Sequence, residues 1–285
     1  GNGLQVERKR YSYEKNYLSG VETVKKLVEE FDKISDQKCT VGIGIPGFSS
    51  NETGLITNAN SLWLNDKPFK KDLEIALNRN VKLMNDANCF TLSEAVDGAG
   101  KDYQSIFGII IGTGFGGALS YKKEIIEGAN QIAGDWGHQP LPYPSKEELE
   151  TKINCPSMNC GRPLCSEQFM SGIGFKDVFN QKNNTNFSSE EIVQLDLDGD
   201  PRANLELNLY EDRMARLMAV MIGIFDPEAI ILGGGMSNID RFYKNIPPLI
   251  PKYTFSNKVI TKVLKNFHGD SSGVRGAAWL WNDAT

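Results

Sequence analysis

The sequence predicts an α/β protein whose two domains share a cleft. The chain has 285 residues, which is longer than a typical single domain. Strand-like apolar runs alternate with helical patterns over roughly the first hundred residues. The alternation restarts near residue 105, where a strongly apolar run leads into glycines. Hydrophobic residues make up 40% of the chain and charged residues 24%, so an ordinary core can form.

The first predicted domain, residues 1–104, follows from local periodicity. GLQVERKRYSY alternates in polarity as an amphipathic strand does, whereas apolar residues from Val21 to Ile34 recur at helical intervals. CTVGIGIPG is rich in β-branched residues and is ended by Pro46 and Gly47, as expected for a buried strand. The elements expected here are a strand at 3–13, a helix at 21–34, a strand at 39–47, a helix at 67–80, a strand end at 82–86 and a helix that starts immediately after Asp86.

The second predicted domain, residues 105–272, opens with a hairpin. SIFGIIIGTGFGGALSY predicts two strands joined by a glycine turn. AIILGGGMS predicts a further buried strand that runs into a second glycine turn, and residues 273–285 predict a C-terminal helix that returns to complete the first domain. A long helix precedes AIILGGGMS, and core packing is the simplest role for its apolar stripe of Leu209, Met214, Leu217, Met218 and Met221.

Charge and hydropathy exclude several classes of protein. The net charge of −5 at pH 7 disfavours a nucleic-acid or anionic-membrane binder, because such proteins normally carry a basic face. No run approaches the roughly 20 apolar residues that span a bilayer. The N-terminus also lacks a signal-peptide pattern. We therefore expect a cytoplasmic protein whose thiols stay reduced.

Three of the five cysteines lie in NCPSMNCGRPLC, at Cys155, Cys160 and Cys165. A disulfide framework is disfavoured, because such frameworks belong to short secreted chains with even cysteine counts. Three thiolates need one more donor for a tetrahedral zinc site, and the histidines are His138, the nearer in sequence, and His268. Four protein ligands would leave zinc no open position, so its role would be structural. The alternative is that these are ordinary buried thiols.

Two glycine-rich turns follow apolar strands, at residues 112–117 and 233–237. Such turns allow a polyanion to approach backbone N–H groups, and Thr113 adds a hydroxyl. A tight structural hairpin is the alternative for each turn. Neither turn matches the lysine-bearing phosphate loop or the GxGxxG dinucleotide turn.

Asp86 lies where a strand gives way to a helix, which would expose its carboxylate at the mouth of a cleft. Helix capping is the simple alternative. Phosphoryl transfer to an alcohol needs a carboxylate to accept the hydroxyl proton, donors for the phosphates and a divalent metal. Asp86 and the glycine turns would supply the first two. Four polar side chains near the cysteine loop and Asp86 are suited to binding a polyol: Asn60, Asn85, Asp135 and Glu167. Surface exposure without a binding role is the alternative for each of them.

Several segments, in this order along nearly the whole chain, resemble the ROK family of sugar kinases: IGIPG, NDANCFTLSEA, IIIGTGFGG, GDWGH, CGRPLCSEQFMSGIGF and IILGGGMSN. NANSLWLNDKPF and HGDSSGVRGAAWLW are most similar to the bacterial fructokinases of the manno(fructo)kinase type. The substrate expected below rests on that similarity alone.

The resemblance implies an actin-like ATPase fold, related to ribonuclease H, with two domains around a cleft. It implies an ATP:hexose 6-phosphotransferase that uses Mg²⁺, acts on fructose, also accepts mannose and forms homodimers. Asp86 matches the family's catalytic base. The matching sugar-binding positions are Asn60, Asn85, Asp86, Asp135, His138 and Glu167. The matching phosphate and adenosine contacts are Gly112, Thr113, Gly114, Gly233, Gly234 and Gly235. The implied Zn²⁺ ligands are His138, Cys155, Cys160 and Cys165.

The sequence departs from the family pattern at three places. Asp135 stands where the family usually has Glu, and a shift of sugar contacts by about 1 Å could cost up to about 100-fold in rate. The family's CxC pair becomes CPSMNC, so we expect Cys155 to coordinate, with Met158 as the alternative. The family's first strand and DxGGT turn are not present before GNG, and we expect an incomplete N-terminus. If this were the whole chain, ATP affinity and turnover should be badly impaired.

Three other functions were weighed against a fructokinase. A non-catalytic sugar sensor of the ROK family would need sugar affinity but no proton acceptor, so Asp86 favours an enzyme. An N-acetylhexosamine kinase is the second alternative, since related ROK kinases act on such sugars. A structural filament protein of actin-like fold is disfavoured by the cysteine loop and by the polar side chains suited to a sugar.

Overall fold

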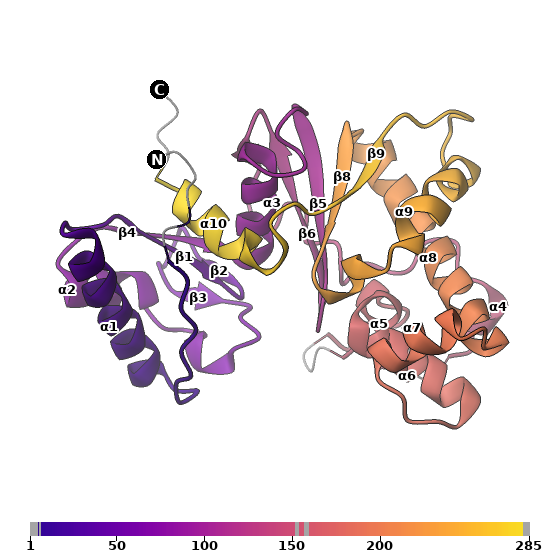
Figure 1. Ribbon diagram of the computed structural model, residues 1–285, viewed down its shortest axis with the longest axis horizontal. Coiled ribbons are helices and arrows are strands. Elements are labelled where there is room, and N and C mark those ends of the chain that lie inside the picture. The colour runs from indigo at the N-terminus through magenta and orange to yellow at the C-terminus, as the bar shows by residue number, and fades with distance from the viewer. Residues whose placement is uncertain (1–4, 6, 152–153, 157–159, 282–285) are drawn as a thin grey trace.

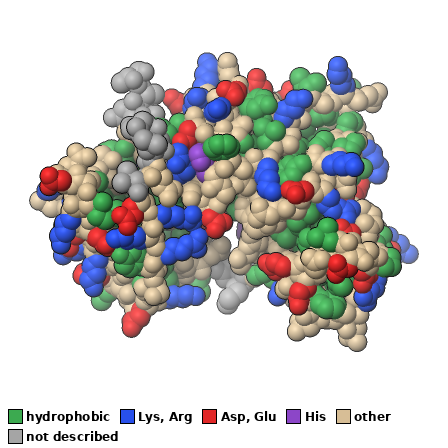
Figure 2. Space-filling view, in the orientation of Figure 1, with side chains coloured by type: hydrophobic (Ala, Val, Ile, Leu, Met, Phe, Trp, Pro, Cys, Tyr) green, Lys and Arg blue, Asp and Glu red, His purple; other side chains and the backbone are tan. Residues whose placement is uncertain are grey.

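The computed structural model of the protein describes residues 5, 7–151, 154–156 and 160–281. Its elements form two groups along the longest axis of the molecule, with helices α3 (Asp86–Val96) and α10 (Ser272–Trp279) between them (Figure 1). Figure 2 shows a hollow between the two groups. The predicted α/β architecture is therefore observed.

The first group is organised around a two-stranded parallel sheet. Strand β1 (Val41–Ile45) pairs with β4 (Val81–Asn85), and Ile45 lies opposite Asn85. The apolar faces of helices α1 (Tyr17–Ser35) and α2 (Phe69–Leu77) pack against this sheet in one core. Asn16 caps the start of α1, and Asn78, with φ of 48°, ends α2. The other elements here are β2 (Phe48–Ser49), β3 (Ile56–Thr57) and the 3-10 helix η1 (Leu62–Leu64).

The strand expected at residues 3–13 is wrong for the described part of that segment. Residues 5 and 7–14 do not form a strand. Within the described part of the chain β1 pairs only with β4, so no neighbouring strand meets the backbone of this segment. Side chains hold it instead, since Arg8 donates to Ser271 Oγ at 2.9 Å and Tyr11 donates to Glu30.

The second group contains a five-stranded sheet in the order β7-β6-β5-β8-β9. Strands β5 (Ser105–Ile111) and β6 (Phe115–Tyr121) form the predicted antiparallel hairpin. Strand β8 (Ala229–Gly233) pairs in parallel with β5, and β9 (Lys262–Lys265) with β8. The short β7 (Glu124–Ile125) pairs with the end of β6.

A cluster of helices packs on one face of this sheet (Figure 1). They are α5 (Ser166–Met170), α6 (Gly172–Asn183), α7 (Ser189–Leu197), α8 (Pro201–Phe225) and α9 (Arg241–Asn245). The smaller elements are α4 (Lys146–Leu149) and the 3-10 helices η2 (Gly235–Asn238), η3 (Pro247–Tyr253) and η4 (Gly269–Ser271). None of the helices in the described ranges has both the length and the apolar composition needed to cross a membrane.

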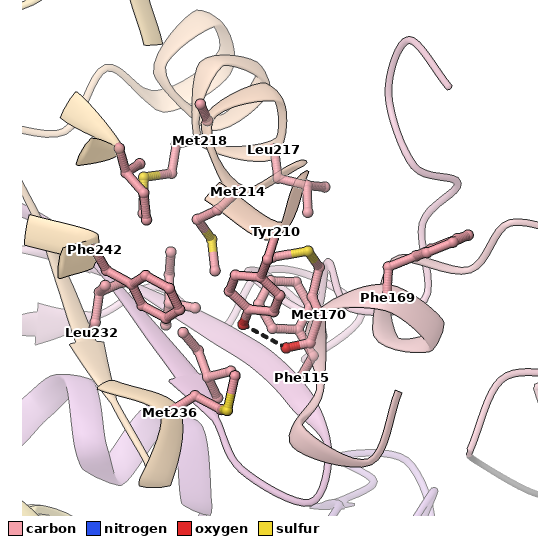
Figure 3. Packing of buried hydrophobic residues seen from close by; sticks show 14 of the residues in the cluster. Phe115, Phe169, Met170, Tyr210, Met214, Leu217, Met218, Leu232, Met236 and Phe242 are labelled. Carbon is pink, nitrogen blue, oxygen red and sulfur yellow. Dashed lines mark hydrogen bonds between the residues drawn. The ribbon is translucent and has the colours of Figure 1, made fainter. Parts of the chain in front are cut away.

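Helix α8 is the centre of the second core. Asp200 caps its start and Pro201 is its first residue, where a missing N–H leaves no hydrogen bond unmade. Four residues of the predicted stripe are buried, namely Met214, Leu217, Met218 and Met221, whereas Leu209 is only partly buried. Met214 and Met218 belong to the same packed cluster as Phe242 (Figure 3). The Tyr210 hydroxyl donates to the Met170 carbonyl at 2.8 Å, which ties α8 to α5.

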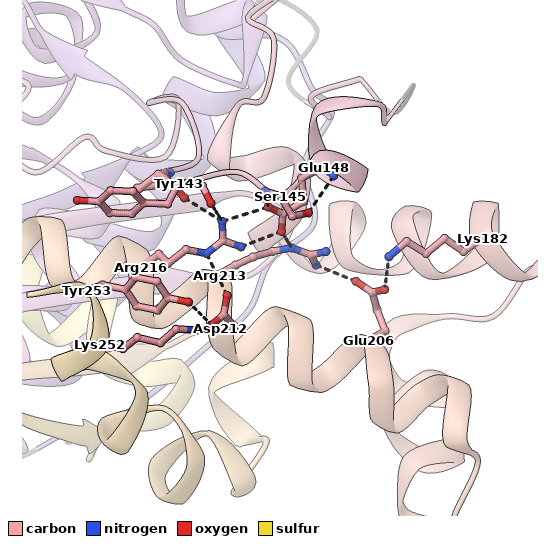
Figure 4. A network of polar contacts seen from close by, with 11 residues as sticks. Tyr143, Ser145, Glu148, Lys182, Glu206, Asp212, Arg213, Arg216, Lys252 and Tyr253 are labelled. Atoms are coloured by element: carbon pink, nitrogen blue, oxygen red, sulfur yellow. Dashed lines mark hydrogen bonds and ion pairs between the residues drawn. The ribbon is translucent and has the colours of Figure 1, made fainter.

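Buried charges tie the loop before the cysteines to α8 (Figure 4). Arg213 and Arg216 donate to Glu148 of α4 at 2.7 and 2.8 Å. Arg213 also donates to Glu206 at 2.7 Å. Because buried charges are stable only when paired, the network holds α4 on α8.

Helix α10 lies between β1 and α3, as expected for a helix that returns to the first group. A Cβ at Gly276 would be 1.7 Å from the Cys89 carbonyl oxygen, and one at Gly42 would be 1.8 Å from that of Ala277. Only glycine permits such close approach. The division into domains 1–104 and 105–272, with 273–285 completing the first, stays a prediction.

Candidate active site and metal centre

The start of α3 presents Asp86 directly after β4. Asn85 is the N-cap, because its Oδ1 accepts from the backbone N–H groups of Ala87 at 2.9 Å and Asn88 at 3.3 Å. Asp86 is the first helical residue, and its Oδ1 also accepts from Ala87 N at 2.9 Å. The capping role considered for Asp86 therefore falls mainly to its neighbour.

The carboxyl group of Asp86 has a raised pKa. The Asp86 side chain is exposed to solvent on one side, yet many protein atoms surround it on the others. The resulting desolvation raises the pKa, and backbone N–H groups of Ala87 and Asp86 oppose the rise in part. A more basic carboxylate takes up a proton more readily, which suits a general base.

The turn at Gly47 lies between the segment that carries Asn60 and the side chain of Asn85. The Gly47 carbonyl accepts a hydrogen bond from Asn85 Nδ2 at 3.2 Å. A Cβ at Gly47, whose φ is 118°, would lie 2.9 Å from Ala59 Cα, so the residue before Asn60 packs directly on this turn. Asn65 fixes Ala59 through hydrogen bonds of 2.8 and 3.0 Å. The Asn60 side chain itself is exposed.

The two glycine turns lie side by side at one end of the five-stranded sheet. Ile110 of β5 is opposite Gly233 of β8, so residues 112–114 and 233–235 leave adjacent strands together. Gly234 has φ of 82°, and a Cβ there would be 2.4 Å from the Ile111 carbonyl oxygen. Thr113, Gly234 and Gly235 are exposed. Because the two turns leave adjacent strands at the same end of the sheet, a single polyanion bound there would contact both of them.

Helix α3 runs opposite to β5 and directs its N-terminus toward these turns. A Cβ at Gly108 would be 2.1 Å from Thr91 Oγ1, and one at Gly233 would be 2.4 Å from the Phe90 ring. Gly100, beyond the other end of α3, lies against Ile106 at the start of β5. Asp86 precedes Phe90 by about one helical turn. The carboxylate therefore lies at the glycine-turn end of the sheet.

Two antiparallel segments bring the predicted metal ligands together. Glu167 N donates to Gly137 O at 2.8 Å and Leu141 N donates to Leu164 O at 2.8 Å, so residues 137–141 run beside 164–167. His138 Nδ1 is consequently 3.4 Å from Cys165 Sγ and 3.9 Å from Cys155 Sγ. The ligand atoms of His138, Cys155, Cys160 and Cys165 all lie within 4.8 Å of one another.

The donor set fits a tetrahedral zinc ion. Zn–S bonds of about 2.3 Å and Zn–N bonds of about 2.0 Å place ligand atoms at separations of this size. Burial raises the pKa of the Cys165 thiol to about 11, and a bound cation would favour the thiolate instead. His268 is not near this cluster, since its Nε2 is 2.9 Å from Asp97. Met158, the alternative to Cys155, lies outside the described residues.

The sequence matches the ROK family over residues 1–284. The chain belongs to the ROK family. An N-acetyl-D-glucosamine kinase from Vibrio cholerae is 37% identical over 93% of this chain and 88% of that protein. The resemblance to ROK sugar kinases is thus confirmed at the level of the family, whereas this relative does not support the choice of a fructokinase.

Two solved ROK structures have the same fold. A ROK hexokinase from Thermus thermophilus has a TM-score of 0.79 at 23% identity, over 92% of this chain and 85% of that one. A ROK glucokinase from Streptomyces griseus, solved with glucose and AMPPNP, has a TM-score of 0.79 at 21% identity, over 98% of this chain and 92% of that one. The expected actin-like two-domain fold is confirmed.

Two further polar residues of this ROK protein occupy different environments. Glu167 is 5% exposed, and its Oε2 accepts from the backbone N–H of Phe115 at 3.0 Å. Asp135 is exposed, on a segment pressed against β6: a Cβ at Gly134 would be 2.7 Å from Ala118 Cα. The surface alternative therefore does not apply to Glu167, which lies under the first glycine turn.

Sequence reasoning missed two contacts that organise this ROK site. Glu94, fully buried in α3, accepts from Ser272 Oγ at 2.9 Å and from Phe267 N at 3.0 Å, which holds α3 to the chain before α10. No local pattern indicated this role, because α3 also carries the buried polar residues Asn88, Thr91 and Ser93. Gln131 Oε1 accepts from Asn51 N at 3.1 Å and joins the two groups of elements, and no local pattern indicated it.

Proposed function

We propose that this ROK protein transfers the γ-phosphoryl group of ATP to the 6-hydroxyl of a hexose, with Asp86 as the general base. The position of Asp86 carries the proposal. A carboxylate of raised pKa begins α3, and that end of the helix faces the two glycine turns. Phosphoryl transfer requires a proton acceptor and phosphate donors in this relation.

The residues have distinct roles in this reaction. The 6-hydroxyl oxygen bonds to the γ-phosphorus, and the bond from that phosphorus to the β,γ-bridging oxygen breaks, so ADP leaves with the electron pair. The hydroxyl proton passes to the Asp86 carboxylate. The Gly112 N–H already donates to the Gly114 carbonyl at 3.0 Å. Backbone N–H groups of the other residues of the two turns hold the phosphates, with the Thr113 hydroxyl as a further donor. Mg²⁺, when bound, neutralises charge on the phosphates.

Fructose is the hexose that we propose as the preferred substrate, with mannose also accepted. The support is the similarity of NANSLWLNDKPF and HGDSSGVRGAAWLW to manno(fructo)kinases. Asn60 is the third residue of the first segment, and its neighbour Ala59 packs on the Gly47 turn, to which Asn85 is hydrogen-bonded. Asn60, Asn85, Asp135, His138 and Glu167 would bind the sugar hydroxyls.

N-acetyl-D-glucosamine is the second candidate substrate. The Vibrio cholerae relative, 37% identical to this chain, is an N-acetyl-D-glucosamine kinase and favours it. The two sugars differ at carbons 1 and 2: fructose has its anomeric carbon at position 2, whereas N-acetyl-D-glucosamine carries there an acetamido group that needs both room and a hydrogen-bonding partner. The preference for one sugar over the other therefore depends on the residues that surround carbon 2 of the bound sugar. The proton transfer to Asp86 is the same for both sugars.

A zinc ion held by His138 and the three cysteines would pin the loop that carries the sugar contacts. Reduced thiols and ATP are both found in the cytoplasm, where we place the reaction. The homodimer expected from the family stays a prediction that light scattering would test.

A coupled ADP-release assay with MgATP and a panel of hexoses tests the proposal. Fructose should give the highest kcat/KM among fructose, mannose, glucose and N-acetyl-D-glucosamine. A higher kcat/KM with N-acetyl-D-glucosamine would transfer the assignment to the second candidate. Sugar binding by calorimetry without phosphorylation of any hexose would instead identify a non-catalytic sensor.

A further inference from the structure

We infer that Glu167 is a positioning residue that connects the Cys₃His cluster to the Gly112–Gly114 turn, so that metal binding strengthens nucleotide binding. The inference deepens the function proposed above and rests on it. It concerns binding of the nucleotide in the absence of sugar, and is therefore separate from any contact between Glu167 and the hexose.

One oxygen of Glu167 holds the glycine turn. Oε2 accepts from Phe115 N at 3.0 Å, and Phe115 is the first residue of β6 after the turn. A Cβ at Gly114 would lie 3.0 Å from the same oxygen, so the carboxylate also lies directly beneath the turn. The side chain is 5% exposed, and a buried hydrogen bond of this kind holds the backbone firmly in place.

The other oxygen of Glu167 reaches the metal cluster. Oε1 lies 3.6 Å from Cys155 Sγ. Glu167 follows Cys165 by two residues, and its backbone N–H donates at 2.8 Å to Gly137, the neighbour of His138. The backbone of Glu167 is therefore hydrogen-bonded next to His138, and its side chain lies beside Cys155.

A second connection reaches the same turn from the start of α6, the helix that follows α5. Gly172, the first residue of α6, donates from its N–H to the Gly112 carbonyl at 2.8 Å. Ser171, which lies between the two helices, donates from Oγ to the Glu167 carbonyl at 2.8 Å. Helix α5 thus begins after Cys165 and leads directly into this contact. A metal ion that fixes Cys165 would fix both contacts, because only one short helix separates them.

The decisive measurement is calorimetric titration with the ATP analogue AMPPNP and Mg²⁺, without sugar. Glu167→Ala should weaken AMPPNP binding about tenfold, since Phe115 N loses its buried acceptor. Glu167→Gln should remain within about threefold of the parent, because its amide oxygen can accept the same hydrogen bond. A residue that acted only on sugar would change neither value.

Metal removal tests the connection to the cluster. Protein stripped with a chelator and returned to Mg²⁺ alone should bind AMPPNP several-fold more weakly, with metal loss verified by elemental analysis. The same treatment should weaken AMPPNP binding by a smaller factor in Glu167→Ala than in the parent, because the Glu167 contact is already lost there and only the Gly172 contact still responds to the metal.

Glu211→Ala is the matched control. It removes another buried carboxylate from the same group of elements, one that pairs with Arg241 and contacts neither the turn nor α4. Its AMPPNP affinity should equal that of the parent. If Glu167→Ala does not fold, Glu167→Asp replaces it, since its carboxylate is one methylene too short to reach Phe115 N.

The outcomes separate this inference from the proposed function. No AMPPNP binding by the parent protein would refute the proposed function. Binding by the parent with an unchanged affinity in Glu167→Ala, or in Glu167→Asp, would refute the inference alone. An equal loss on metal removal in the parent and in Glu167→Ala would also refute it.

Discussion

The Asn85 amide donates from Nδ2 to the Gly47 carbonyl oxygen at 3.2 Å, while its Oδ1 caps α3. One side chain thus ties the turn after β1 to the start of the helix that carries Asp86. The position of the proposed base therefore depends on a contact between two adjacent strands as well as on the helix itself.

Asn85→Ala should lower the free energy of unfolding by about 0.5–2 kcal/mol, because α3 loses its N-cap. It should also raise KM for the sugar, since the Gly47 turn and Asn60 shift. Asn16→Ala is the control: it removes the corresponding cap of α1, away from the glycine turns, and should cost similar stability without changing KM. Equal KM values for the two variants would contradict the proposed role of Asn85.

Asp86→Asn should reduce kcat by about 10²–10⁴-fold, because the amide cannot accept the hydroxyl proton. Its melting temperature at pH 7 should be no lower than that of the parent, since ionising a desolvated carboxyl costs stability and the amide removes that cost. Asp102→Asn, an exposed aspartate near the start of β5, should leave kcat unchanged. Parental turnover by Asp86→Asn would refute the mechanism.

The pH profile should follow Asp86. Desolvation raises its pKa above the ordinary value of 3.8, and only the ionised form accepts a proton. Sugar kcat/KM should therefore be full above the raised pKa and fall as the pH drops through it. The acid limb should have an apparent midpoint above 3.8 when measured with saturating MgATP. A midpoint at or below the ordinary aspartate value would contradict this assignment.

Cys160→Ser should lose the bound metal. The parent, purified without chelator, should contain about one zinc per chain. The variant should contain far less and unfold at a lower temperature, because metal binding contributes directly to folding. Cys39→Ser changes a cysteine outside the cluster and should retain zinc. Undiminished stoichiometric zinc in Cys160→Ser would reject the ligand set.

Glu148→Gln should lower the free energy of unfolding at neutral pH by about 3 kcal/mol, because it breaks a buried ion pair. Burial favours the neutral form of Glu148, but hydrogen bonds from Arg216, Ser145 N and Arg213 outweigh it and lower its pKa from 4.5 to about 2. This contribution is complete above pH 4.5 and is lost as the pH falls toward 2. Urea unfolding of the parent should therefore weaken more steeply over that window than that of Glu148→Gln.

Glu191→Gln is the matched control for this experiment. Glu191 has the same capping-box role at α7 that Glu148 has at α4, but it is exposed. Its replacement should change the free energy of unfolding by less than about 0.5 kcal/mol. A comparable loss in both variants would mean that the capping box, and not the arginine pairing, stabilises α4.

Local pattern was sufficient for the elements that carry Asp86 and the two glycine turns, whereas it predicted no element at helices α4 to α7 and α9 or at strand β9. The apolar periodicity of residues 21–34 predicted α1, and the glycines after Ile111 predicted the β5–β6 hairpin. It failed at residues 3–13, because a strand requires a neighbouring backbone that the segment itself cannot specify. The cluster of cysteines indicated a metal site, and the resemblance to the ROK family implied the ligand set with His138 that the structure brings within 4.8 Å.

The sequence by itself determined which side chains could carry the chemistry: one carboxylate at a strand-to-helix junction, two glycine turns and a set of soft metal ligands. Only the tertiary structure decided that Asn85 ties the start of α3 to the turn at Gly47, that β5 and β8 pair in parallel to bring both turns together, and that Glu167 lies beneath one of them. Helix and turn preferences depend on neighbours along the chain, whereas these relations depend on hydrogen bonds and close packing between distant segments.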